Sequence, residues 1–351
     1  MEYRLLGRSG LKVSTLTFGT ATFGGVGDLA KWGSTDVTNA RRLLDICIDA
    51  GINTVDTANL YSYGKSEEIL GEAMEGRRNQ LIVATKLGFP MGKGVNDHGL
   101  SRFQIIKECE ASLKRLRISH IDLYQMHQWD GLTPLQETLE AFDALIRAGK
   151  VRYIGASNFS GWHLMKAMET ARVNHFVPIV SQQIYYSLES RDAEYELIPI
   201  TLDQGLGVLI WSPLAGGLLS GKYRRGKTPE EGGRHLNDWH EPPIYNQEKL
   251  YDTIEVLVAI AEARGISAAE VALAWLLGRP GVTSVVFGAR TEDQLRKNLR
   301  SADLTLTAEE RKKLDDISLP TLIYPYWHQR NTAADRLGPA DLSLIGPYLD
   351  K

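Results

Sequence analysis

The chain has 351 residues, and its 43% hydrophobic and 24% charged residues are typical of a globular protein with an ample core. The net charge of -3 at pH 7 is too small to favour nucleic acid or an anionic membrane as a partner. No apolar run approaches the roughly 18 residues of a membrane span, and the N-terminal residues lack the apolar segment of a signal peptide. The two cysteines, Cys47 and Cys109, have no metal-binding spacing and suit a reducing compartment. We therefore expect a cytoplasmic protein without a metal site, whose oligomeric state the sequence leaves open.

Residues 3–14 predict two short strands around an Arg-Ser-Gly turn, after which strands and helices alternate. The strands are short, continuous apolar runs, so both of their faces should be buried, as in a parallel sheet. The helices carry apolar residues three and four positions apart. Eight strand–helix units are predicted, at 16–19 and 35–50, 53–55 and 66–75, 81–85 and 102–117, 121–125 and 134–148, 153–155 and 161–172, 180–184 and 192–204, 208–211 and 248–264 with 268–277, and 285–287 and 292–301.

Eight such units predict an α/β protein with a (β/α)8 TIM barrel rather than an open doubly wound sheet. No linker divides the chain, so we expect one domain over 1–351, with the barrel at about 15–301. The N-terminal β-hairpin and the extra helices after strand 7 and after helix 8 lie outside the repeat. The C-terminal helix and tail, 307–351, begin with a Thr-x-x-Glu capping box, and the end of the tail has no clear period.

Ionisable residues end three neighbouring strands of the predicted barrel. Asp56 ends the second strand, Lys86 the third and His127 the fourth, and Tyr61 lies on the loop after the second. Singly, each could be a turn, surface or packing residue. Because active sites of such barrels lie at the C-terminal ends of the strands, their coincidence favours a catalytic site.

A phenol beside a lysine suits proton transfer to or from a substrate oxygen. Free tyrosine has a pKa near 10, and we expect the ammonium of Lys86 to lower the pKa of Tyr61 by stabilising the phenolate. Asp56 would pair with Lys86, and His127 could hydrogen-bond the substrate. No side chain supplies the hydride that carbonyl reduction needs, so a nicotinamide cofactor is expected.

The segment 51–67, GINTVDTANLYSYGKSE, resembles the signature of the aldo-keto reductases, and the resemblance runs from about residue 7 to 318. It implies a (β/α)8 barrel, NADPH (with NADP+ as its oxidised form) and the reversible reduction of aldehydes or ketones. By position, Asp56, Tyr61, Lys86 and His127 match the family's catalytic tetrad, with Tyr61 as the proton donor. The residues around 288–294 are similar to the bacterial and potassium-channel-β-like branches.

The same resemblance implies a cofactor site along the strand ends. Ser157, Asn158 and Gln183 match residues that hold the nicotinamide amide, and Trp211 matches the aromatic that stacks on its ring. Further candidates are Gly19, Thr20, Ala21, Asp56, Ser212, Pro213, Leu214, Ala215, Gly216, Lys222, Gly288, Arg290, Gln294 and Asn298, with Arg234 on the long loop after the seventh strand.

Phosphate-binding patterns occur at two places in the second half of the chain. The segment 216–223, GGLLSGKY, nearly fits a P-loop, but Tyr223 stands where magnesium binding needs Ser or Thr. Its backbone amides and Lys222 could instead hold a pyrophosphate. Arg290, at a helix start, suits a phosphate and is the main candidate for discriminating NADPH from NADH.

Aromatic residues on the loops could form the substrate pocket and would favour flat or bulky apolar carbonyl compounds. The candidates are Phe23, Trp32, Tyr63, Trp129 and the tail segment 324–327, although each could equally cover a loop surface. Three functions remain open. They are a carbonyl reductase or alcohol dehydrogenase, an NADPH-binding regulatory subunit with little turnover, and a barrel isomerase or aldolase that uses Lys86 as a Schiff-base amine. Trp211, Gln183 and Arg290 disfavour the last.

Overall fold

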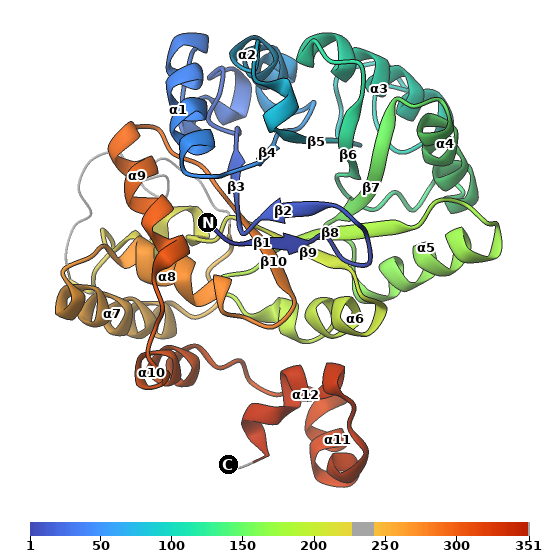
Figure 1. Cartoon of the computed structure of the whole chain (residues 1–351). Helices are drawn as coiled ribbons and strands as arrows, with labels where there is room; N and C mark the ends of the chain where they lie inside the picture. The colour runs from blue at the N-terminus through green and yellow to red at the C-terminus, as the bar shows by residue number, and fades with distance from the viewer. Residues whose placement is uncertain (227–241, 350–351) are drawn as a thin grey trace.

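The computed structural model describes residues 1–226 and 242–349, and its centre is a closed barrel of parallel strands surrounded by helices (Figure 1). The strand order around the barrel is β10-β3-β4-β5-β6-β7-β8-β9. The predicted (β/α)8 fold is therefore confirmed. The strands are β3 (Leu16–Gly19), β4 (Thr54–Asp56), β5 (Ile82–Leu87), β6 (Ile121–Met126), β7 (Val151–Ser157), β8 (Ile179–Tyr185), β9 (Gly207–Trp211) and β10 (Val282–Phe287).

Helices that follow the barrel strands along the chain cover the outer face of the barrel (Figure 1). They are α1 (Val37–Asp49), α2 (Lys65–Ala73), α3 (Arg102–Leu116), α4 (Leu135–Arg147), α5 (Gly161–Val173), α6 (Leu197–Gln204), α7 (Gln247–Arg264), α8 (Ala268–Leu277) and α9 (Glu292–Arg300). The predicted helix at 192–204 is wrong in its first part, where a 3-10 turn at Asp192–Glu194 precedes α6. Pro199 explains the break, because its ring would clash with the carbonyl four residues earlier in a longer helix.

The N-terminal hairpin closes one end of the barrel. Its strands, β1 (Tyr3–Leu5) and β2 (Lys12–Ser14), pair antiparallel and lie across that end (Figure 1). Hairpin residues Leu6 and Val13 form one buried cluster with Ala84, Leu123, Val180, Leu209 and Val286 of the barrel strands. The apolar plug leaves only the opposite end, where the strands finish, available for a polar site.

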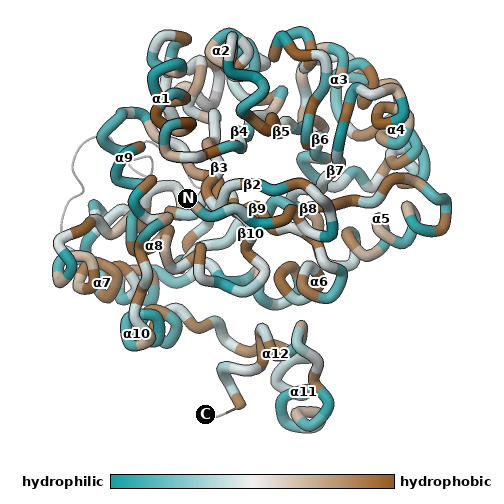
Figure 2. The backbone as a smooth tube through the Cα atoms, viewed as in Figure 1, coloured by the Kyte–Doolittle hydropathy of each residue, from teal (hydrophilic) through white to brown (hydrophobic). Residues whose placement is uncertain are grey.

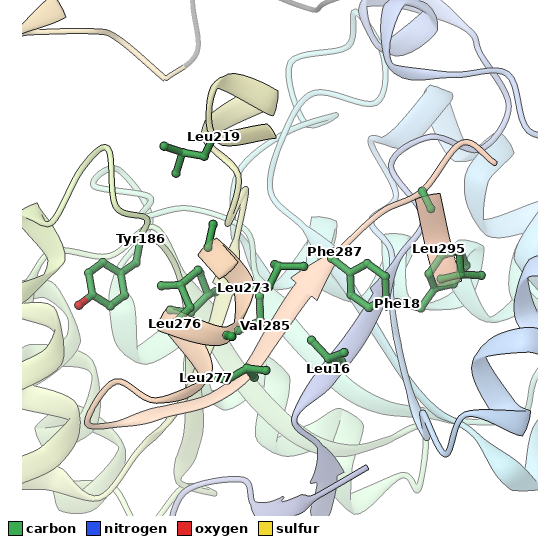
Figure 3. Close-up of a cluster of buried hydrophobic side chains, with 14 of the residues drawn as sticks. Leu16, Phe18, Tyr186, Leu219, Leu273, Leu276, Leu277, Val285, Phe287 and Leu295 are labelled. Carbon is green, nitrogen blue, oxygen red and sulfur yellow. The ribbon is translucent and has the colours of Figure 1, made fainter. Parts of the chain in front are cut away.

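A second apolar layer lies between the barrel wall and the helices. Figure 3 shows side chains of α8 packed against Val285 on β10, and Phe287 beside Phe18 of β3. The two phenyl rings meet edge to face, with centroids 6.3 Å apart. The neighbouring α9, drawn mostly in teal in Figure 2, buries little beyond Leu295 and Asn298. Among the helices of the described residues, none has both the length and the apolar character that a membrane crossing requires.

The tail lies beside the barrel rather than over the mouth formed by the strand ends. The predicted capped helix is α10 (Ala308–Ser318), and two helices that the sequence did not predict follow, α11 (Tyr326–Ala333) and α12 (Pro339–Ile345). The last packs against α6. Lys249 Nζ donates to the Leu319 carbonyl at 2.8 Å, and Arg191 Nη1 donates to the Asp315 carbonyl at 3.0 Å. These bonds fix the start of the tail to the barrel.

Shortening the plug should destabilise the whole barrel. Leu6 is 0% exposed, whereas Leu5 beside it is 53% exposed. Leu6→Ala should lower the free energy of unfolding by about 2–5 kcal/mol, because it leaves a cavity in the closed end. Leu5→Ala should change it by less than about 0.5 kcal/mol. Urea denaturation of both variants checks this, and equal effects would contradict the plug.

Candidate active site

A cavity of about 1160 Å³ opens at the C-terminal ends of the barrel strands. Asp56, Tyr61 and His127 line one part of it, and the cavity extends past Trp211 to Arg290. Its walls come from the ends of the strands and the loops after them, which is where a (β/α)8 barrel places its functional residues.

Lys86 lies buried behind this wall, and its ammonium group makes three hydrogen bonds. Nζ donates to Asp56 Oδ2 at 2.6 Å, to the Thr57 carbonyl at 2.8 Å and to Tyr61 Oη at 3.4 Å. Burial acts to lower the pKa of Lys86, but the negative charge of Asp56 and the contact with Tyr61 raise it above its ordinary value. The lysine is therefore held as a cation directly beside the phenol.

The pKa of Tyr61 is raised above its ordinary value because the phenol is buried. The charge of Lys86 acts in the opposite direction but does not outweigh burial. The lowering effect of Lys86 that the sequence predicts is therefore present, but burial outweighs it and the pKa of the phenol lies above its ordinary value. The phenol therefore keeps its proton at neutral pH.

His127 lies beside Tyr61, with ring centroids 6.0 Å apart, and Phe89 meets its ring edge-on at 4.6 Å. Burial lowers the pKa of His127 well below its ordinary value, and the charge of Lys86 adds to this effect. The imidazole is therefore neutral at neutral pH. Its buried Nδ1 has no hydrogen-bond partner in the part of the chain that the structure describes. A neutral ring can still donate one hydrogen bond to a substrate.

Two glutamine side chains hold the second oxygen of the Asp56 carboxylate. Gln183 Nε2 donates to Oδ1 at 2.8 Å, and Gln125 Nε2 donates to it at 3.3 Å. Gln125 was missed in the sequence. It lies on β6, two residues before His127, which directly follows this strand. Strand alternation therefore predicts both side chains on the same face, and this signal could have found Gln125.

Polar groups suited to an amide lie beyond the tetrad. Ser157 Oγ is buried without a hydrogen-bond partner among residues 1–226 and 242–349, and Ser157 lines the cavity. Asn158 donates from Nδ2 to the His127 carbonyl at 3.0 Å and accepts from Trp211 Nε1 at 3.0 Å. A ligand amide reaching Ser157 would satisfy the hydroxyl that the protein leaves unpaired.

The far part of the cavity has glycine-rich backbone and basic side chains. Gly216 and Gly217 have φ values of 64° and 104°, and a Cβ on Gly217 would meet nothing within 4 Å. Lys222, Arg290 and Lys297 all line this part, although Lys297 also pairs with Asp293 at 2.7 Å. Open backbone and several cations suit the phosphates of a dinucleotide.

The structure brings most of the candidate cofactor residues to one cavity. Every such residue within the described chain lines it except Ala215, which is buried beside it. Arg234 lies outside the described residues. Gln294 does more than line the wall, because its Oε1 accepts from the backbone N–H of Arg290 at 3.1 Å and shapes that loop.

Two of the four candidate substrate residues, Trp32 and Tyr63, line the cavity. Phe23 does not, because it is buried against Phe18 with ring centroids 6.0 Å apart. Trp129 is also not among the lining residues and stacks on His163 at 4.1 Å. The tail aromatics at 324–327 do not line the cavity either. Tyr326 stacks on Tyr195, and Tyr324 contacts Trp327, with both of these side chains exposed.

Several lining residues escaped the sequence reasoning. Phe89 and Tyr185 follow or end strands in the same way as the tetrad, and Tyr185 contacts Trp211 with ring centroids 5.0 Å apart. Their position near a strand end was an available signal. Val26 and Leu60 lie on loops, and no sequence pattern indicated that they would line the cavity.

Comparison with known proteins agrees with this geometry. The model of the Aldo/keto reductase family matches residues 15–319. "Uncharacterized oxidoreductase YrpG" of Bacillus subtilis (strain 168) is 42% identical over 328 residues, covering 90% of this chain and 96% of that protein. "Probable voltage-gated potassium channel subunit beta" of Oryza sativa subsp. japonica is 38% identical over 327 residues, covering 90% and 96%. The Arabidopsis thaliana protein of the same name is 36% identical over 312 residues, covering 87% and 92%.

The family match extends over the barrel and its first C-terminal helix, and the relatives align along nearly their whole length. The chain therefore belongs to the aldo/keto reductase family of oxidoreductases.

Proposed function

We propose that this protein is an oxidoreductase that reversibly reduces an aldehyde or ketone with NADPH, and that Tyr61 is the proton donor. The observation that carries the proposal is the contact of Tyr61 Oη with Lys86 Nζ, which is itself paired with Asp56. A protonated phenol at a cavity wall, backed by a buried cation, is an acid prepared for a carbonyl oxygen.

In the proposed reaction the substrate oxygen lies between Tyr61 and His127. Neutral His127 donates a hydrogen bond that polarises the carbonyl, and Tyr61 gives up its proton as negative charge develops on the oxygen. Lys86 then stabilises the phenolate. In alcohol oxidation the phenolate takes the proton back. A bound nicotinamide supplies or accepts the hydride, which no side chain can do.

The residues around the cavity would hold NADPH along its length. Ser157, Asn158 and Gln183 would bind the nicotinamide amide, and Trp211 would stack on its ring. The backbone at 216–217 and Lys222 would face the pyrophosphate, and Arg290 the 2'-phosphate. The unpaired Ser157 hydroxyl and the basic far end of the cavity support this assignment.

The composition of the cavity wall near Tyr61 favours an uncharged substrate that is flat or bulky. Trp32, Tyr63, Phe89 and Leu60 line it, and these aromatic and apolar surfaces favour apolar carbonyl compounds. The free, buried cysteines Cys47 and Cys109 suit a reducing compartment, and on that ground we place the protein in the cytoplasm.

The alternative is an NADPH-binding regulatory subunit with little turnover. The names of the two plant relatives favour it, because both are called potassium channel subunits. The two functions differ in whether NADPH is consumed when a broad panel of aldehydes is supplied.

Removing the phenol of Tyr61 should abolish reduction without abolishing NADPH binding. Tyr61→Phe should lower kcat by about 10²–10⁴-fold, the usual contribution of general acid catalysis. Tyr63→Phe, the neighbouring phenol at the same cavity, should lose far less. NADPH absorbance follows the rate and fluorescence titration follows binding. A wild type as inactive as Tyr61→Phe would exclude the enzyme and leave the regulatory subunit.

The pH profile of reduction should be flat through neutral pH. Tyr61 must be protonated, and burial keeps its pKa above the ordinary value, so activity falls only above about pH 10. His127 stays neutral because its pKa is well below the ordinary value, so no step is expected near pH 6.5. The measurement is kcat/KM for the carbonyl substrate against pH. A fall centred between about pH 7 and 9 would contradict a burial-raised phenol.

Arg290 should discriminate between the two nicotinamide cofactors. Arg290→Ala should weaken NADPH binding about 10- to 100-fold, because a hydrogen bond to a charged group contributes about 1.5–3 kcal/mol. NADH binding should change little. Arg296→Ala is the control, because this exposed arginine on α9 does not line the cavity. Fluorescence titration of each variant with NADPH and with NADH measures these affinities. If Arg290→Ala weakened the binding of both cofactors equally, Arg290 would not have the assigned role.

A further inference from the structure

The loop that carries Tyr61 has a backbone that needs support from its surroundings. Ser62 and Tyr63 have φ values of 50° and 51°, and Gly64 follows with 89°. Left-handed backbone at two successive non-glycine residues costs of order 1–3 kcal/mol each and persists only where neighbouring contacts impose it. The position of the phenol therefore depends on what anchors this loop.

Asn59 anchors the loop from two sides. It is fully buried, and its backbone N–H donates to the carbonyl of Lys86 at 3.1 Å. Its side-chain Nδ2 donates to Glu108 Oε2, on α3, at 2.9 Å. One residue thus joins the Tyr61 loop to the backbone of the active-site lysine and to a helix outside the barrel.

A buried ionic network fixes the outer end of this connection. Arg115 Nη2 lies 3.5 Å from Glu108 Oε2, and Arg115 Nε donates to Glu67 Oε2 at 2.6 Å. Glu67 Oε1 accepts from Thr85 Oγ1 at 2.6 Å, one residue before the active-site lysine on β5. The contacts form a closed ring that starts and ends on β5.

The same arginine also supports the far end of the loop. A Cβ added to Gly64 would lie 2.7 Å from Arg115 Cδ, so the glycine backbone rests directly on this side chain. Contacts with α3 therefore hold the loop on both sides of Tyr61, through Asn59 before it and Gly64 after it.

We propose that Asn59, held by Glu108 and Arg115, is a positioning residue that sets Tyr61 Oη against Lys86 Nζ. The inference rests on the proposed role of Tyr61 as proton donor. The Oη–Nζ distance of 3.4 Å is already near the limit of a hydrogen bond, so a small loop displacement breaks it. A displacement of about 1 Å in a catalytic group can lower a rate by about 100-fold.

The test compares two asparagines at opposite ends of β4. Asn59→Ala removes the bond to Glu108. Asn53→Ala is the matched control, because Asn53 makes similar loop ties at the closed end, accepting from Ser14 N at 2.8 Å and donating to the Lys12 carbonyl at 2.9 Å. Asn59→Ala should lower kcat about 10- to 100-fold while the Kd for NADPH stays within about twofold. Asn53→Ala should lower stability only.

Two further measurements keep the inference open to refutation. The ¹³Cζ resonance of Tyr61 in tyrosine-labelled protein, assigned by its loss in Tyr61→Phe, should shift in Asn59→Ala and not in Asn53→Ala. Glu108→Gln, which retains an acceptor for Asn59, should keep most of the rate that Glu108→Ala loses, so the α3 side is tested even if Asn59→Ala does not fold.

The outcomes separate this inference from the proposed function. A wild type without turnover refutes the function alone, and the Tyr61 resonance then decides the positioning role. An active wild type whose Asn59→Ala variant has an unchanged kcat and an unshifted Tyr61 resonance overturns the inference.

Discussion

The buried ion pair between Lys86 and Asp56 is the interaction on which the rest of the site depends. An unpaired ammonium in this position would cost several kcal/mol, so Lys86 needs the carboxylate, and the carboxylate needs the donors that Gln183 and Gln125 provide. The closed end of the barrel contributes by being apolar, with Leu6 in its plug. Polar groups therefore gather at the open end, where the strand ends present them to one cavity.

Burial sets the protonation state of Tyr61 and His127, two side chains that line the cavity. It raises the pKa of Tyr61 and lowers that of His127, so the phenol and the imidazole are both neutral and both able to donate. Lys86 is the cation behind them. In the proposed reaction, this combination supplies an acid and a charge that stabilises its conjugate base, so a group as weak as a phenol can transfer a proton at neutral pH.

The residues at the strand ends could be predicted well from the sequence, whereas the burial and the contacts of side chains inside the protein could not. Asp56, Lys86 and His127 could be placed together because a parallel barrel brings the ends of its strands to one side. The direction in which the pKa of Tyr61 is shifted could not be predicted. The sequence indicates the neighbouring charge of Lys86, but it does not show the depth of burial that outweighs this charge. Contacts such as Asn59 with Glu108 join residues 49 positions apart through α3, and no local pattern records them. The aromatic character of a loop residue was also a poor guide to the substrate pocket. Phe23 and Trp129 pack away from the cavity, whereas Phe89 lines it.

The central claim is that the protein reduces a carbonyl with Tyr61 as the acid, and its most direct test follows the transfer of deuterium from labelled NADPH to the product. Wild-type protein and Tyr61→Phe are each incubated with an aldehyde and with NADPH that carries deuterium at the transferable position of its nicotinamide, and the alcohol is examined by mass spectrometry. A reductase that uses Tyr61 as its acid should yield alcohol with one deuterium on the former carbonyl carbon from the wild type and almost none from Tyr61→Phe. No labelled alcohol from a wild type that binds NADPH, or equal amounts from both proteins, would contradict it.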